Sequence, residues 1–443
     1  MQTGRQDGLI FVVLGALVFV LLGVAMEQLL HGPLTDFKGI YYPSRTLLEH
    51  GDPYNPDQVL RVYRAESGAR QTDNKKTMVV TTVLPYLPSV FVLSVPFALL
   101  PWKLASGAWV ALTAASLIFA AWLAWDLSRG AMPVLSGVLI GFLLAGSEVL
   151  LVIGNAAGLI VALCVLAVWC FMERRFESIG VLCLALALAV KPQDAGFIWL
   201  YFLLAEGRLR KRALQTLGVV GVIAAATVVW VSRVSPLWRH ELAANLATHS
   251  QHGGLADPGP ASLGAHGMAM IVNLQAVFSV FRDDAHFYNL VTYFVCAVLI
   301  AAWIFVTIRM KYSPLKTWLG LSVIAGLTML PTYHRQYDTK LLLLTIPACA
   351  LLWAEGTRAG RIAVMVNAAT IVLNSDLTWA VILGVVHSVP VQRGGIGEHF
   401  MVGLQVFPAP LSLLASSMAF LYVYVRSGSR EDGSDSIVAS KST

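Results

Sequence analysis

Long apolar segments recur from one end of this chain to the other. The first, residues 9–28, matches the ~20 residues that a helix needs to cross a bilayer, and no small-residue cleavage site follows it. Charged residues make up only 13% of the chain, against about a quarter in soluble domains. Further apolar segments lie at residues 105–125, 132–153, 158–171, 180–190, 194–204, 214–231, 287–308, 318–330, 341–353, 362–386 and 401–425. We therefore predict an all-α polytopic transmembrane helical bundle of about twelve spans.

Short basic loops separate these segments and predict their orientation. Arginine and lysine collect on the cytoplasmic side of a membrane. The basic loops are residues 126–130, 173–177, 206–212, 309–316 and 355–361, together with the tail from Arg426. About twelve spans place all of them on that side. The prediction is one transmembrane domain over residues 1–426, followed by a disordered cytoplasmic tail at 427–443.

The same rule, that basic loops lie on the cytoplasmic side, predicts a hairpin within residues 180–204. A single helix there would put the basic residues before and after it on opposite faces, so Lys191-Pro192-Gln193 is interpreted as an outer turn. The remaining outer loops are residues 31–102, 232–286, 331–340 and 387–399. In the first of these, prolines at 85, 88 and 96 favour a short interfacial helix over a spanning one.

Composition excludes several classes of protein. The net charge of +6 reflects the basic loops and indicates no nucleic-acid partner. All five cysteines lie in apolar segments without C-x-x-C spacing, so neither disulfides nor a zinc site are expected. The chain has no P-loop, dinucleotide fingerprint or H-E-x-x-H motif. No cofactor is predicted.

The order of several short motifs resembles the membrane glycosyltransferases of the GT-C superfamily, and within it glycosyltransferase family 87. The matching residues are Asp36, Tyr41, Leu47, Leu48, Gly51 and Tyr54, then Tyr86-Leu87-Pro88, Pro96, Leu100-Pro101, Gly154-Asn155, residues 187–193 and residues 334–340. The chain departs from the family pattern at Asn155, where glutamine is usual, and at Leu87, which separates the tyrosine from the second proline. Both departures bear on which sugar is bound.

The resemblance implies an inverting transferase that moves a hexose, with mannose first, or a pentose from a polyprenyl-phosphate sugar to a lipid or glycan acceptor. The active site would lie on the non-cytoplasmic face of the cell membrane, and membrane lipids would be further partners. A carboxylate suits the base that removes the acceptor proton, and Asp36 matches the family's catalytic aspartate. The alternative for Asp36 is a helix cap.

Positive charge would stabilise the leaving lipid phosphate. The resemblance and the topology assign donor or phosphate binding to Lys191, His334, Arg335, Asn155 and Gln193, and acceptor contacts or a loop role to Tyr41 and Tyr54. Lys191 could instead pair with Asp194 or reach toward the interface, and Arg335 could pair with Asp338. His334 could be an ordinary loop histidine.

Three alternatives remain open at this point. His249, His252, Asp257 and His266 could gather a metal, but their spacing matches no tight ligand pattern and we expect none. A secondary transporter or lipid flippase would also be polytopic, but that class usually has internal repeats and ionisable groups near the midplane. A scaffold that has lost activity is a third possibility.

Overall fold

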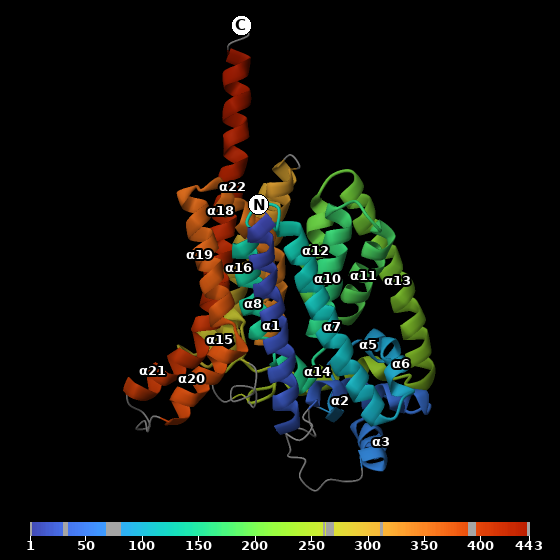
Figure 1. Ribbon diagram of the computed structural model, residues 1–443. Coiled ribbons are helices and arrows are strands. Elements are labelled where there is room, and N and C mark those ends of the chain that lie inside the picture. The colour runs from blue at the N-terminus through green and yellow to red at the C-terminus, as the bar shows by residue number, and fades with distance from the viewer. Residues whose placement is uncertain are drawn as a thin grey trace.

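The computed structural model is built of α-helices and describes residues 2–29, 34–67, 81–259, 262, 270–310, 313–388 and 396–440 (Figure 1). Within these ranges the extended pairing is a single bridge between Ile271 and Arg335. The predicted all-α class is confirmed. The helices are α1 (Gln2–Leu29), α2 (Thr35–Leu48), α3 (Pro56–Ser67), α5 (Pro88–Leu93), α6 (Val95–Ala98), α7 (Trp102–Ser128), α8 (Pro133–Ala145), α9 (Val149–Ile153), α10 (Ala157–Met172), α11 (Glu177–Val190), α12 (Pro192–Leu204), α13 (Arg208–Val234), α14 (Trp238–Ser250), α15 (Leu274–Ser279), α16 (Ala285–Arg309), α17 (Pro314–Leu327), the 3-10 helix η1 (Gln336–Thr345), α18 (Ile346–Glu355), α19 (Arg358–Leu373), α20 (Asp376–Ser388), α21 (Ile396–Val406) and α22 (Pro408–Ser440).

Seven helical segments in the described part of the chain are long and apolar enough to cross a bilayer. They are Gly4–Leu29, Trp102–Ser128, Pro133–Ile153, Arg208–Val234, Ala285–Arg309, Gln336–Glu355 and Pro408–Ser427. An eighth is obtained if α19 and α20, which are bent by 59°, count as one span. The count of about twelve is not confirmed, because it includes short segments: the 16 residues of α10 measure roughly 24 Å at 1.5 Å per residue, against a core of about 30 Å.

Glycines bring α1 and α8 into direct backbone contact. A Cβ atom on Gly8 would lie 2.3 Å from the Pro133 carbonyl oxygen, and one on Gly15 would lie 2.4 Å from that of Gly141. On α8, a Cβ on Gly137 would lie 2.1 Å from the carbonyl oxygen of Gly8. Small residues at such contacts are the usual means by which helices pack in membranes. The first span is therefore part of the bundle.

The polar elements gather at one end of the bundle. Helices α2, α3, α5, α6 and α14 lie at its lower end in Figure 1, and the C-terminal part of α22 extends beyond the opposite end. Two short helices, α5 and α6, occupy the proline-rich stretch for which one interfacial helix was predicted. Helix α22 continues to Ser440, past residue 427 where disorder was predicted, and the tail contains no proline that would end it.

Ion pairs confirm the predicted chain reversal at Lys191. Glu177, at the start of α11, accepts hydrogen bonds from Arg208 and Arg212 at the start of α13. Arg208 also donates to the carbonyl oxygen of Phe171, at 2.9 Å. Helix α11 therefore leaves the basic end of the bundle and α12 returns to it. Lys191, between the two helices, lies at the far end of this hairpin.

Candidate functional site

Helix α2 is anchored to the turn between α9 and α10. The amide of Leu34 donates to the carbonyl oxygen of Val152 at 3.0 Å, and the ring of Phe37 stacks on Trp109 at 4.5 Å between centroids. Gly154 has a φ of +68°, and a Cβ there would lie 2.8 Å from the Cβ of Phe37. Glycine is therefore needed at 154 for both its backbone angle and its lack of a side chain. This contact fixes where the first turn of α2 lies.

Asp36 lies in that first turn and contacts Asn155. The Nδ2 of Asn155 donates to Oδ2 of Asp36 at 2.6 Å, while Oδ1 of Asn155 accepts from the amide of Ala157 at 2.8 Å. The second bond fixes which way the Asn155 amide points. The other oxygen of Asp36 has only a long contact, 3.4 Å, from the Thr35 hydroxyl. Helix α2 has no side-chain cap, so the predicted capping alternative for Asp36 is wrong.

Burial raises the pKa of the Asp36 carboxyl above its ordinary value. The hydrogen bond from Asn155 opposes this rise in pKa, as do the positive charges of Arg335 and Lys191. Both cations are therefore close enough to act on the carboxylate. Residues from α2, the turn before α10, the α11–α12 hairpin and the segment before η1 thus form one electrostatic group.

Lys191 is held by two carboxylates. Its ammonium contacts Oδ1 of Asp338 and lies 3.1 Å from Oδ2 of Asp194, and it sits 5.5 Å from the ring centroid of Tyr337. Both aspartates are buried. The sequence alternative of a Lys191–Asp194 pair is confirmed, and Asp338, 147 residues away, joins it. The positive charge of Lys191 is thus shared with two acids before any ligand arrives.

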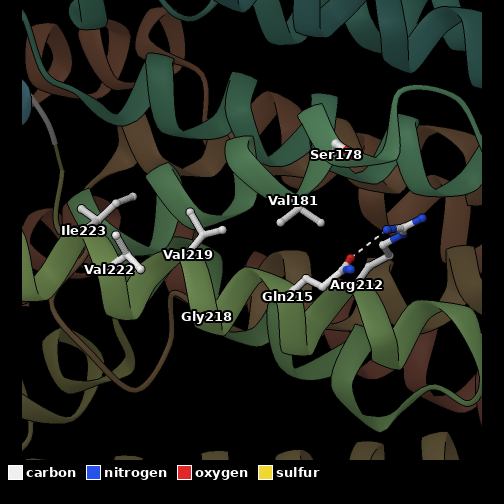
Figure 2. Close-up of a pocket in the computed structure, with 8 residues that line it drawn as sticks. All are labelled: Ser178, Val181, Arg212, Gln215, Gly218, Val219, Val222 and Ile223. Carbon is white, nitrogen blue, oxygen red and sulfur yellow. Dashed lines mark hydrogen bonds between the residues drawn. The ribbon is translucent and has the colours of Figure 1, made fainter.

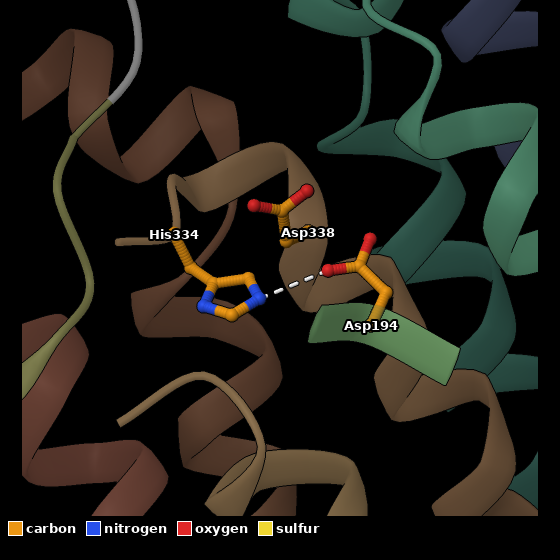
Figure 3. Close-up of side chains that lie close together, drawn as sticks. All are labelled: Asp194, His334 and Asp338. Carbon is orange, nitrogen blue, oxygen red and sulfur yellow. Dashed lines mark hydrogen bonds and ion pairs between the residues drawn. The ribbon is translucent and has the colours of Figure 1, made fainter. Parts of the chain in front are cut away.

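His334 completes this group (Figure 3). Its Nε2 lies 2.9 Å from Oδ1 of Asp194, and its Nδ1 lies 3.1 Å from the carbonyl oxygen of Thr332. One ligand atom each from Asp194, His334 and Asp338 lies within 4.8 Å of the others, which is close enough for a metal ion. The Lys191 ammonium, however, already contacts both carboxylates. His334 is fully buried and hydrogen-bonded, unlike an ordinary loop histidine.

Arg335 follows in the same segment and is only 9% exposed. Its Nε donates to the Tyr333 hydroxyl, and its Nη2 donates to the carbonyl oxygen of Leu255 at 3.0 Å. Its backbone amide donates to Oδ2 of Asp338 at 3.0 Å. The contact between Arg335 and Asp338 is thus made by the Arg335 backbone, and an ion pair between their side chains stays a prediction. The guanidinium instead ties the long outer loop to the site.

Tyr41 and Tyr54 form hydrogen bonds with other residues of the first outer loop. The hydroxyl oxygen of Tyr41 lies 2.8 Å from both the carbonyl oxygen of Leu100 and the Glu66 carboxylate, so its one proton is shared between two acceptors. The hydroxyl of Tyr54 donates to the carbonyl oxygen of Tyr86, also at 2.8 Å. Both rings are fully buried. These contacts hold the first outer loop together.

Gln193 lies at the hairpin turn with an exposed side chain. Its backbone carbonyl accepts a hydrogen bond from the Thr328 hydroxyl at 2.7 Å. This contact joins the turn to the end of α17. Lys191 lies two residues earlier in the same turn.

The histidines of the long loop do not form a metal cluster within the described residues. Nε2 of His249 lies 2.6 Å from the carbonyl oxygen of Val83. His252 lies 3.5 Å from Asp257, whose carboxylate accepts backbone hydrogen bonds within its own loop. His266 lies outside the described residues. The contacts of His249 and Asp257 organise the loop.

Sequence reasoning assigned no site role to Asp194, Asp338 or Tyr86. The spacing of Lys191 and Asp194, three residues apart across a helix start, was a usable signal for the first. Asp338 carries no such local signal. Burial raises the pKa of the Tyr86 hydroxyl, and the nearby charge of Asp36 raises it further. The Tyr86-Leu87-Pro88 motif placed Tyr86 in the first outer loop, but it did not predict that Tyr86 lies near Asp36.

Comparison with known proteins gives one match. Residues 84–332, more than half of the chain, match the model of glycosyltransferase family 87. No curated protein and no solved structure matches the chain. The match includes Asn155, Lys191 and Asp194, whereas Asp36 and His334 lie outside it. With its membrane-spanning helices, this chain belongs to glycosyltransferase family 87 and is a membrane glycosyltransferase.

Proposed function

We propose that this protein transfers a sugar from a polyprenyl-phosphate donor to a lipid or glycan acceptor on the non-cytoplasmic face of the cell membrane, with inversion. Mannose is the first choice of sugar, and the architecture would be of the GT-C type. The observation that carries the proposal is the convergence of Asp36 with Asn155, Lys191 and Arg335 at one end of the bundle. That end is opposite the basic starts of α11 and α13.

Asp36 is the proposed general base. A base works best when its pKa lies near the working pH, and burial moves the pKa of Asp36 upward, in that direction. Asn155 holds Oδ2, so the less engaged Oδ1 is the oxygen that would accept the acceptor hydroxyl proton. The acceptor oxygen then attacks the anomeric carbon and the lipid phosphate leaves. Attack from the face opposite the phosphate inverts the anomeric configuration.

Arg335 is the stronger candidate for the donor phosphate. Lys191 is already held by the carboxylates of Asp194 and Asp338, and Arg335 is the cation whose charge lowers the pKa of Asp36 more. An arginine also matches phosphate geometry through paired N–H donors. Lys191 and His334 then contribute as members of the same buried polar group. The lipid phosphate is a weak base, so it needs positive charge more than a proton.

The segment of α5 and α6 suits the role of an interfacial element beside the prenyl chain. Its leucines at 87 and 99 are 42% and 64% exposed, although both are apolar. Ser89 and Phe91 face inward and are buried. Exposed apolar side chains of this kind are stable where the acyl region of a membrane meets water.

The test uses membranes with radiolabelled polyprenyl-phosphate mannose and a range of acceptors. Asp36→Asn is expected to lower turnover by about 100-fold or more, because the base is lost while size is kept. Asp57→Asn is the matched control, since Asp57 is an exposed carboxylate in the same loop. Undiminished turnover in Asp36→Asn would remove Asp36 as the base. Donors carrying glucose or a pentose, run in parallel, would identify the sugar, and movement of a lipid without donor consumption would favour a transporter.

A further inference from the structure

A groove runs between α11 and α13, away from the site described above (Figure 2). It has a volume of about 550 Å³ and lies open along one side of the bundle. Its lining is Ser178, Val181, Arg212, Gln215, Gly218, Val219, Val222 and Ile223. Figure 2 shows the polar side chains at one end and the valines and isoleucine along the rest. The groove is thus amphipathic along its length.

The apolar part of the groove is not closed by another helix. A Cβ atom on Gly218 would have no heavy atom within 4 Å, although glycines elsewhere in this bundle let helices approach closely. Val222 is 71% exposed, which is high for a valine that lines a concave surface. Since α13 is long and apolar enough to span a membrane, lipid is the material available to fill an open groove along it.

The polar end of the groove carries excess positive charge. Arg208 and Arg212 share one carboxylate, that of Glu177. Arg212 also donates to Gln215 at 2.7 Å, at the same end of the groove. Arg210 and Lys211 are exposed beside them. An anionic group at this end would therefore meet a cluster of four basic side chains.

This end lies in the leaflet opposite the candidate active site. Arg212 is 19 residues from Val231 along the continuous helix α13, a rise of roughly 28 Å at 1.5 Å per residue. That distance is close to the thickness of a bilayer core, about 30 Å. Val231 packs with Leu47 and Tyr54 of the first outer loop. A donor whose sugar reaches Asp36 therefore has its phosphate in the other leaflet.

We propose that the groove binds an anionic glycerophospholipid, with one acyl chain along Gly218 and Val222 and the phosphate at Arg212. Charge complementarity favours an anionic over a zwitterionic headgroup, and the leaflet distinguishes this lipid from the donor. The site is separate from the residues proposed for the transfer reaction. Its occupant would fill the space between α11 and α13 and so hold the hairpin that presents Lys191.

A matched pair of glycine variants tests the apolar part. Gly218 and Gly221 are both exposed on α13 without a neighbour within 4 Å of a Cβ, but only Gly218 lines the groove. Gly218→Leu would fill the groove, while Gly221→Leu carries the same change in helix propensity. Native mass spectrometry in detergent with phosphatidylglycerol or phosphatidylcholine would count the bound lipids. We expect a bound phosphatidylglycerol in the unmodified protein and in Gly221→Leu, but not in Gly218→Leu.

A second pair tests the charged end. Arg212→Gln is expected to lower the preference for phosphatidylglycerol over phosphatidylcholine by about fivefold, the effect of one basic residue near an anionic lipid surface. Lys211→Gln, a neighbouring cation outside the groove, should change this preference less. Retention of phosphatidylglycerol by Gly218→Leu, equal binding of the two lipids by the unmodified protein, or equal effects of Arg212→Gln and Lys211→Gln would each overturn the proposal.

Discussion

The side-chain amide of Asn155 donates a hydrogen bond of 2.6 Å to the carboxylate of Asp36, across 119 residues of sequence. This bond joins the first outer loop to the turn before α10. It also leaves one carboxylate oxygen of Asp36 with only a weak contact. The proposed base is therefore oriented by a neutral donor, which lowers its pKa less than an ion pair would.

We expect Asn155→Ala to lower kcat by about 10-fold, because the hydrogen bond that orients Asp36 is lost. Asn155→Gln is the control, since it keeps an amide and introduces the residue usual in the family. Partial activity in Asn155→Gln together with loss in Asn155→Ala would support orientation through the amide. Equal activity in all three proteins would contradict it.

The pH dependence of kcat/KM follows from the same carboxylate. Asp36 acts as a base only when it is ionised, and burial raises its pKa. The rate should therefore fall with decreasing pH at a higher pH than for an exposed aspartate. In Asn155→Ala this acid limb should move higher still, since a bond that lowers the pKa is gone. A pH-rate profile of both proteins measures the shift, and an acid limb that stays in place would contradict it.

The raised pKa of Asp36 also predicts how the stability of the fold depends on pH. Stability should fall as pH rises, whereas the rate should rise. A carboxyl whose pKa is higher in the folded than in the unfolded protein stabilises the fold below its unfolded pKa, and that contribution is lost as pH rises through the folded pKa. Thermal unfolding midpoints in detergent should therefore depend less on pH in Asp36→Asn than in the unmodified protein. An identical pH dependence in the two would show that Asp36 ionises as freely in the folded protein.

Lys191→Met is expected to destabilise the protein strongly. It leaves the buried carboxylates of Asp194 and Asp338 without their cation, and breaking a buried ion pair costs about 3–5 kcal/mol. Adding Asp338→Asn to this variant should recover part of the loss, because one buried charge is removed. Thermal unfolding of the single and double variants measures the coupling. Lys103→Met, at an exposed lysine, is the control, and an equal change there would contradict the interpretation.

Tyr41→Phe distinguishes a structural role from contact with the acceptor. The phenol shares its proton between Leu100 and Glu66 within a buried aromatic cluster, so its loss should cost about 1 kcal/mol of stability. We expect kcat/KM to change by less than about twofold, since the ring stays in place. Thermal unfolding and initial rates would be measured on the same preparation. A large loss of activity at unchanged stability would instead favour the acceptor role.

Local sequence determined the helical membrane class and several positions within it. Apolar length and composition predict spanning helices because a bilayer leaves backbone groups no other partner. The proline after Lys191 and the basic residues around the hairpin predicted a reversal, which the Glu177–Arg208 pair confirms. The number of membrane crossings was harder to predict from the sequence. The length of a helix of 13–16 residues does not by itself show whether that helix spans the membrane.

The tertiary structure decided which polar groups meet. Asp36 and Asn155, or Lys191 and Asp338, are 119 and 147 residues apart, and no local pattern encodes such a pair. Their contact depends on how α2 packs on the turn at Gly154 and on how the α11–α12 hairpin packs on η1. Burial, which sets the pKa of Asp36 and the cost of an unpaired charge, is likewise a property of that packing. The sequence thus determined which polar residues are present and at which end of the bundle they lie. The packing determined which of them contact one another.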